Sequence, residues 1–236
     1  IREQPSALSR AIYGGLFLAL LFGVWFGVTY GEVAEDRIIS PVKVPSPGEV
    51  FSRLTVLITD FGLGRHTLIS LTRVLEGFGL AIIVGLPLGI LAGTFRRVGA
   101  FIAPAVVFFR NVPMAAVVPL TIIWFGTDEL QKVMFIFIAT VAFVTFDTTQ
   151  IVLNVPQAYL DTAYTLGASR RQIVTKVLFP LALPGIFNSL RLLFGLGFGY
   201  IILAEIVNQD KGLGKLIMTA QSRGGHDGGT EVVYLC

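Results

Sequence analysis

The sequence predicts an all-α polytopic membrane protein, and two observations carry that prediction. Of the 236 residues, 54% are hydrophobic and only 14% are charged, with a mean hydropathy of +0.77. Soluble domains carry about 25% charged residues. Apolar runs long enough to cross a bilayer as helices, about 20 residues each, recur along the chain. We therefore expect about five to six transmembrane helices in a single transmembrane domain covering residues 1–236.

The first apolar run precedes a surface helix. Residues 11–30 are expected to form the first span, with a cytoplasmic N-terminus because Arg2 and Arg10 precede the span and acidic residues follow it. Residues 47–61 then carry apolar side chains at helical spacing, and Ser46 with Glu49 forms an S-x-x-E capping box. We expect an amphipathic helix on the outer surface of the membrane.

The remaining spans are expected at residues 68–95, 101–125, 132–152 and 181–207. Arg73 and Glu76 are expected to pair at the outer end of the second span. The third span contains Pro113 and Pro119, which cannot donate helical hydrogen bonds, so it should be kinked or broken. Residues 231–236 are expected to begin a final span that is cut off, in a chain trimmed at both ends.

Charge and cysteine content exclude several classes of protein. The net charge of +3 comes from residues scattered at the ends of apolar runs, which the positive-inside rule explains better than a nucleic-acid partner does. A single cysteine excludes an internal disulfide and a cysteine-based metal cluster. Glycines at four-residue intervals predict close helix packing: Gly85, Gly89 and Gly93 on the second span, and Gly195 and Gly199 on the fifth.

A polar and basic island, residues 156–180, separates the fourth and fifth spans. Its first helix should end at Gly167, which can adopt a left-handed conformation, and Ser169 with Gln172 forms a capping box that starts a second helix. Such a short, capped element with exposed apolar knobs suits a docking role on the cytoplasmic side. An ordinary interfacial loop bound to lipid headgroups is the alternative.

The island resembles the cytoplasmic signature loop of permease subunits of binding-protein-dependent ABC importers, E-A-A-x3-G-x9-I-x-L-P. Ala163, Gly167 and Pro180 match this pattern in register, whereas Asp161 replaces the glutamate. Other stretches, such as RNVPMAAVVPLTIIWFGTDELQK, LAEIV and GLGKLI, resemble the nitrate, sulfonate, taurine and bicarbonate branch. The resemblance covers nearly the whole chain.

The resemblance implies the type I importer permease fold (MetI-like) in a bacterial inner membrane. It also implies a second, identical permease subunit, two cytoplasmic ATPase subunits that bind ATP and Mg, and an extracytoplasmic binding protein that delivers a small oxyanion. The loop 156–180 would couple the subunit to the ATPases through Asp161, Ala163, Tyr164, Leu166, Gly167, Ala168, Ser169, Arg170, Arg171 and Pro180.

Six polar residues are candidates for the translocation path: Arg110, Thr121, Thr145, Asn188, Arg191 and Glu205. For the threonines, a hydrogen bond to the preceding helical turn is the favoured interpretation. Structural pairing or snorkelling is favoured for Glu205. For Arg191, pairing with Asp147 is favoured over attraction of an anion.

Other functions fit less well. No G-x-x-x-x-G-K-[ST] phosphate loop is present, so the chain should not hydrolyse ATP, and we expect no cofactor or metal in it. A membrane enzyme would need a catalytic cluster, yet His66 and His226 lie far apart in sequence. A secondary transporter or channel without an ATPase partner stays as the alternative, although it would leave the signature loop unexplained.

Overall fold

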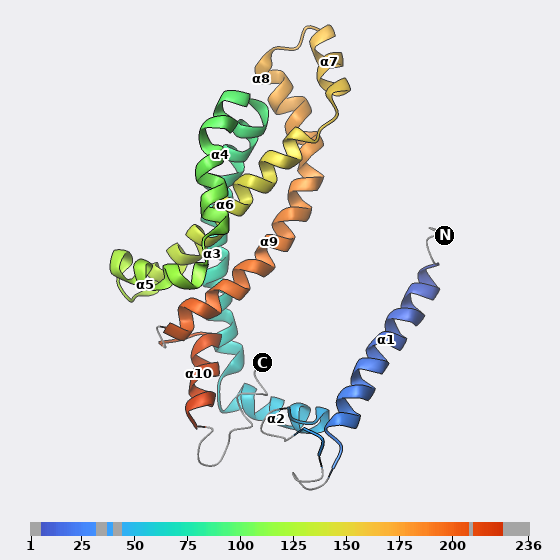
Figure 1. The fold of residues 1–236 in the computed structure, drawn as a ribbon, viewed down its shortest axis with the longest axis vertical. Coiled ribbons are helices and arrows are strands. Elements are labelled where there is room, and N and C mark those ends of the chain that lie inside the picture. Colours follow the sequence, from blue (N-terminus) through green and yellow to red (C-terminus); the bar gives the residue numbers. More distant parts are fainter. Residues whose placement is uncertain (1–5, 32–36, 40–43, 208–209, 224–236) are drawn as a thin grey trace. The chain divides into compact units, whose positions relative to one another are not determined.

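The computed structural model describes residues 6–31, 37–39, 44–207 and 210–223, and all regular secondary structure in these ranges is helical (Figure 1). The expected final span at 231–236 and His226 lie outside the described residues. The chain divides into two compact units, residues 1–64 with 216–236 and residues 65–215. Within the described residues, four helices are long and apolar enough to span a membrane, and a bent pair makes a fifth candidate.

The first unit contains one of these helices and the expected surface helix. Helix α1 (Ala7–Val28) has no buried residue, as suits an apolar helix surrounded by lipid. Helix α2 (Pro47–Thr59) begins at the predicted capping box, which is confirmed: the Ser46 hydroxyl accepts from the Glu49 amide, and the Glu49 carboxylate accepts from the Ser46 amide at 2.7 Å.

The second unit is a bundle built around three long helices, α3 (Leu63–Thr94), α6 (Glu129–Leu153) and α9 (Phe179–Val207). Two shorter helices, α4 (Arg96–Asn111) and α5 (Met114–Phe125), connect α3 to α6. Helix α7 (Gln157–Thr165), helix α8 (Arg170–Gln172) and a π-helical turn (Ile173–Leu178) connect α6 to α9. Helix α10 (Leu213–Arg223) follows α9 in the chain, and only its residues up to Lys215 belong to this unit.

The predicted break in the third span is confirmed. Helices α4 and α5 meet at an angle of 103°, and Figure 1 shows α5 turning away from the direction of α4. Pro113 stands immediately before α5 in extended conformation, so the helix cannot run through it. The expected run 101–125 is therefore two helices, and the first of them begins at Arg96.

Helix α3 lies very close to α6 along its glycines. A Cβ atom on Gly89 would lie 2.5 Å from the Thr148 Cβ, and one on Gly93 would lie 2.7 Å from the Val152 Cβ. Gly85 has neighbours at 3.0 Å. Larger residues at these positions would force the two helices apart. By contrast, nothing in the described residues lies within 4 Å of a Cβ built on Gly195 or Gly199.

Two apolar clusters hold the bundle together. The larger one joins α3, α5, α6 and α9 through residues such as Val74, Val118, Phe135 and Ile201. The smaller one lies where α6, α7 and the start of α9 meet, and it contains Val152, Ala163, Ile173, Leu178, Ala182 and Ile186. The polar island is therefore packed onto the bundle by its own apolar residues.

Candidate functional site

The polar island folds as its sequence predicts. Helix α7 ends at Leu166, and Gly167 has φ +77°. The Ala168 amide donates to the Ala163 carbonyl at 3.0 Å, which closes the helix with the wide bond of a Schellman motif. Ser169 then caps α8, and its capping box with Gln172 is confirmed. Gly167 thus supplies a turn that other residues adopt only with strain.

The two faces of this helix–turn–helix differ in burial. Leu166 is 82% exposed and Tyr164 is 53% exposed, so both project from the tip of the turn. Ala163 and Ile173 are buried in the smaller apolar cluster. Ile173 therefore anchors the turn to the bundle and does not belong to the exposed tip. A force applied at the tip would reach α6 and α9 through this cluster.

The second helix of the island continues into the membrane span. Residues Arg170–Val207 form one helical stretch of 38 residues, with a π-helical turn at Ile173–Leu178. Pro180 cannot donate to the carbonyl of Lys176, four residues earlier, and its ring would crowd that carbonyl. The π-helical turn, which is wider than an α-helical turn, covers residues Ile173–Leu178 and therefore includes Lys176. The second helix of the island and the last span are consequently one continuous helix.

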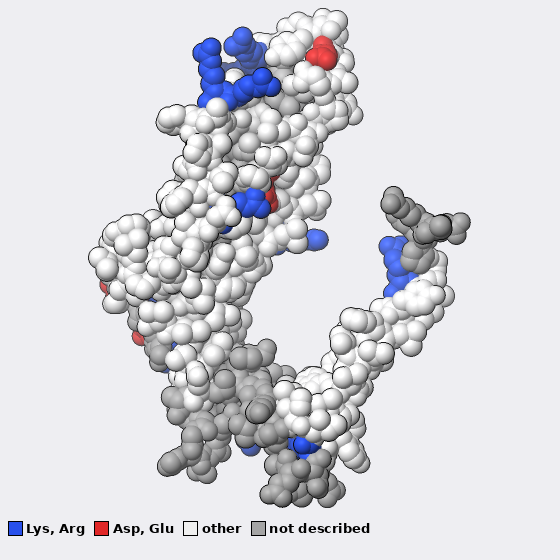
Figure 2. All heavy atoms as spheres, in the orientation of Figure 1, with Lys and Arg blue, Asp and Glu red and all other residues white. Residues whose placement is uncertain are grey.

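Five basic side chains gather at one end of the bundle. Arg96 and Arg97 begin α4, and Arg170, Arg171 and Lys176 lie around α8; all five are exposed. Figure 2 shows Lys and Arg atoms concentrated at this end of the molecule. Asp161, in α7, is exposed and accepts a hydrogen bond from Gln157 at 3.1 Å. This end has the composition expected of a cytoplasmic face.

A buried ionic network lies at the other end, and it confirms the structural pairing favoured for Glu205, although the sequence did not predict its partners. The carboxylate of Glu205 is fully buried and accepts hydrogen bonds from Arg73 at 2.7 Å and from the Ser70 hydroxyl at 2.8 Å. Arg73 also donates to both carboxylate oxygens of Glu129 and to the carbonyl of Lys211 at 2.8 Å. The expected pair of Arg73 with Glu76 is wrong, because Arg73 turns inward to these two carboxylates.

The end of the loop between α9 and α10 and the first turn of α10 are shaped around this network. The Gly214 amide donates to Glu205 at 2.9 Å, and the Leu213 amide donates to Ser70 at 3.0 Å. A Cβ on Gly212 would overlap the Glu205 carboxylate. The sequence Gly212–Leu213–Gly214 thus makes room for the Glu205 carboxylate. It is not part of a phosphate-binding motif. Together with the acidic residue in LAEIV, it was the sequence signal for the network.

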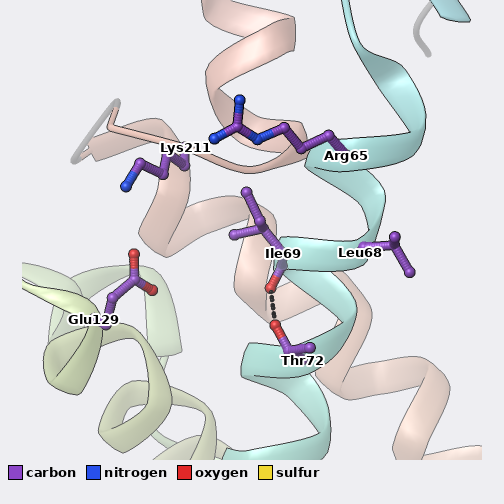
Figure 3. Close-up of a pocket in the computed structure, with 6 residues that line it drawn as sticks. All are labelled: Arg65, Leu68, Ile69, Thr72, Glu129 and Lys211. Atoms are coloured by element: carbon purple, nitrogen blue, oxygen red, sulfur yellow. Dashed lines mark hydrogen bonds between the residues drawn. The ribbon is translucent and has the colours of Figure 1, made fainter.

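A shallow pocket of about 690 Å³ opens beside the network, within the unit formed by residues 65–215. Figure 3 shows Arg65 from α3, Lys211 from the loop after α9 and Glu129 from the start of α6 around it. The Thr72 hydroxyl donates to the Ile69 carbonyl at 2.8 Å and so stays within α3. In the described part of the chain, no group of His, Cys, Asp or Glu residues could hold a metal ion.

The candidate path residues fall in different places. The Thr121 and Thr145 hydroxyls donate to carbonyls of their own helices, at 2.8 Å each. Thr121 also accepts from Gln131. The Arg110 guanidinium lies 4.0 Å from the centre of the Phe146 ring, a cation–π contact between α4 and α6. These three side chains are occupied by contacts inside the bundle.

Asn188 and Arg191 are different, because both are exposed on α9 and lie three residues apart on one face. The predicted pairing of Arg191 with Asp147 is wrong. Asp147 accepts from Ser189 at 2.6 Å. Position 191 points about 200° around the helix from position 189, so Arg191 faces away from α6. No ion pair of Arg191 occurs among the described residues.

Residues 85–235 match the family model for the inner membrane component of binding-protein-dependent transport systems. The chain belongs to this family. The taurine transport system permease protein TauC of Escherichia coli is 34% identical over 208 residues, which is 86% of this chain and 74% of TauC. A putative aliphatic sulfonates transport permease protein, SsuC of Bacillus subtilis, is 31% identical over 94% of this chain and 79% of its own length.

Comparison with solved structures identifies the fold of this permease. A chain from an inward-facing crystal form of the MetNI methionine ABC transporter matches with a TM-score of 0.62 at 22% identity, over 73% of this chain and 85% of the other. The MetI-type permease fold that the sequence predicts is confirmed. The permease is a membrane transport subunit and not an enzyme, and ATP hydrolysis in this family belongs to separate ATPase subunits.

Proposed function

We propose that this permease imports a small oxyanion, such as nitrate, bicarbonate, a sulfonate or taurine, through a passage formed with a second, identical permease subunit. The exposed Arg191 carries the proposal. A cation at this depth on a membrane helix is costly against lipid, so it should face a water-filled path or another protein. The sulfonate and taurine names of the relatives agree with an anionic cargo.

Asn188 complements Arg191 on the same face of α9. Its amide can donate to an oxyanion while the guanidinium supplies charge, and neither group has a hydrogen bond or an ion pair within the described residues. An exposed arginine in a wet passage would attract the anion without holding it tightly, which permits rapid release. Tight binding would then belong to the extracytoplasmic binding protein.

The coupling surface is the tip of the island. Leu166 and Tyr164 would enter a groove on the ATPase, while Arg170 and Arg171 would meet acidic groups around it. The partners in this proposal are two cytoplasmic ATPase subunits that bind ATP and Mg. Because the tip is continuous with α9, movement of the ATPases would tilt the span that carries Arg191.

The same reasoning orients the chain in a bacterial inner membrane. The basic end around α8 would face the cytoplasm, and the end that carries Glu129 and Lys211 would face outward. The number of spans before α3 then places the N-terminus in the cytoplasm. The binding protein would dock on the outward end.

Uptake measurements test the proposal. Cells lacking the chain are complemented with the wild type, Arg191→Gln or a matched control, Arg97→Gln, and the uptake of labelled taurine, an alkanesulfonate, nitrate and bicarbonate is compared. We expect the wild type to restore uptake of at least one anion, Arg191→Gln to reduce it, and Arg97→Gln to preserve it. Uptake that continues after every ATPase subunit is deleted would favour a secondary transporter instead.

A further inference from the structure

One arginine joins three separate parts of the chain at the end of the bundle opposite the coupling tip. Arg73 of α3 is 2% exposed, and its donors bind Glu129 at the start of α6, Glu205 near the end of α9, and the Lys211 carbonyl in the loop beyond α9. The planar guanidinium binds Glu129 through two parallel bonds, which fixes direction as well as distance. This network of Arg73, Glu129, Glu205 and Lys211 is called the clamp below.

The clamp fixes the loop that follows α9 at several points. Besides the Arg73 bond to Lys211, the amides of Gly212, Leu213 and Gly214 donate to His66, Ser70 and Glu205. Helix α3 supplies three of the side chains in these bonds: His66, Ser70 and Arg73. Residues 211–214 are therefore tied to α3 and to α9 by hydrogen bonds.

Glu205 stands at the far end of the same continuous helix that begins at the coupling tip. The stretch Arg170–Val207 has 38 residues and is about 57 Å long at 1.5 Å per residue. Ser169 caps one end of it, and Glu205 is buried in the clamp at the other. A partner bound at the outer loops and a partner bound at the coupling tip would thus act on opposite ends of the same helix.

We propose that Arg73 is a positioning residue for transport. By holding Lys211 and the start of α6 against α3, it makes the docking of the binding protein act on α9 and so on the coupling tip. The inference rests on the proposed function, because it needs a binding protein outside and an ATPase inside. Without the clamp, the outer loops would absorb the docking energy by moving locally.

A purely structural clamp is the competing explanation. Two buried or half-buried ion pairs are not required for stability, since well-packed apolar side chains of similar size often serve as well. If the clamp serves only stability, its loss would impair folding and would lower basal and stimulated ATPase activity by the same factor. A positioning clamp would change the response to the binding protein and leave the ATPase turnover in its absence unaltered.

The test compares three variants of the intact transporter in lipid nanodiscs: Arg73→Gln, Glu129→Gln and the control Arg65→Gln. Arg65 lies on the same helix and lines the same pocket but is exposed. The side chain of Glu129 is 55% exposed, so Glu129→Gln should fold even if Arg73→Gln does not. ATPase activity is measured with and without saturating, cargo-loaded binding protein, alongside thermal stability.

We expect Arg73→Gln and Glu129→Gln to lower the stimulation by the binding protein at least about fivefold, the lower range of allosteric coupling. Glu129→Gln should leave basal ATPase activity unchanged, whereas Arg73→Gln should also lower thermal stability, because Glu205 then lacks its buried cation. Arg65→Gln should behave as the wild type. Wild-type stimulation in both clamp variants, or equal loss of basal and stimulated activity together with thermal stability in Glu129→Gln, would overturn the inference. A wild-type chain that brings no ATPase would instead contradict the proposed function itself.

Discussion

The guanidinium of Arg73 and the carboxylate of Glu205 lie 2.7 Å apart, although 132 residues separate them in the sequence, and both side chains are shielded from solvent. Glu205 also accepts from Ser70 and from the Gly214 amide, so its oxygens are fully used. Removing Arg73 would leave a buried carboxylate without its charge partner, which costs about 3–5 kcal/mol. The pair therefore couples α3 to α9.

Removing one member of this pair should destabilise the subunit more than removing both. Glu205→Met leaves the Arg73 charge without its buried partner, and we expect a loss of about 3–5 kcal/mol. The double variant Arg73→Met, Glu205→Met should lose less, because no uncompensated charge is left. Unfolding in mixed micelles with increasing SDS measures both. Equal stability of Glu205→Met and the wild type would contradict the role of the pair.

The close approach of α3 to α6 can be tested with two alanines on one helix. Gly89→Ala places a methyl group 2.5 Å from the Thr148 Cβ, and we expect it to destabilise the bundle by about 1–3 kcal/mol. Gly79→Ala is the matched control, since nothing lies within 4 Å of its Cβ. It should raise helix stability slightly. Equal melting temperatures for the two variants would show that the helices separate freely.

The turn at Gly167 depends on backbone conformation and not on space. Its φ is +77°, and nothing lies within 4 Å of an added Cβ. Gly167→Val should therefore leave insertion intact and weaken recovery of the ATPase, whereas Gly167→Asn, which tolerates the left-handed region, should retain most of it. Affinity purification followed by ATPase quantification distinguishes the two. Equal recovery with valine and asparagine would refute this explanation of the turn.

The cap of α2 should resist acid. Hydrogen bonds from Arg37 lower the pKa of Glu49 from its usual 4.5 to about 2. The stabilising contribution of this group is thus complete above pH 4.5 and is lost as the pH falls through about 2. The contribution is small, because the Glu49 side chain is 35% exposed and solvent screens the pair.

A carboxyl ¹³C NMR titration of the subunit, assigned with Glu49→Gln, measures this midpoint. Arg37→Gln should raise it toward 4.5, the usual value for glutamate. A Glu49 midpoint near 4.5 in the wild-type protein would contradict the Arg37 contact.

Local features of the fold were predictable from the sequence because their causes are local. Ser46 and Ser169 each have a partner three residues later, and Gly167 follows a short helix, so the caps and the turn needed no tertiary information. Pro113 likewise predicted a break. The angle of 103° was not predictable, because it depends on how α5 packs against α6 and α9.

The partners of charged residues were not predictable in the same way. Arg73 has an acidic residue three positions along its own helix, yet it binds Glu129 and Glu205 from distant segments. Arg191 was expected to pair with Asp147, but one face of α9 packs on α6 and Arg191 lies on another. Only the rotation of each helix about its axis decides these contacts, and apolar periodicity is weak where lipid surrounds the bundle.

Photo-crosslinking from the coupling tip tests the central claim most directly. A photoreactive amino acid replaces Leu166, which is 82% exposed, or Leu68, which is 62% exposed near the start of α3 and serves as the control. The tagged subunit is irradiated in native membranes, and its adducts are identified by mass spectrometry. We predict that position 166 forms an adduct with an ATPase subunit and that position 68 does not. An absence of ATPase adducts at position 166, in membranes where the chain supports uptake, would contradict the account.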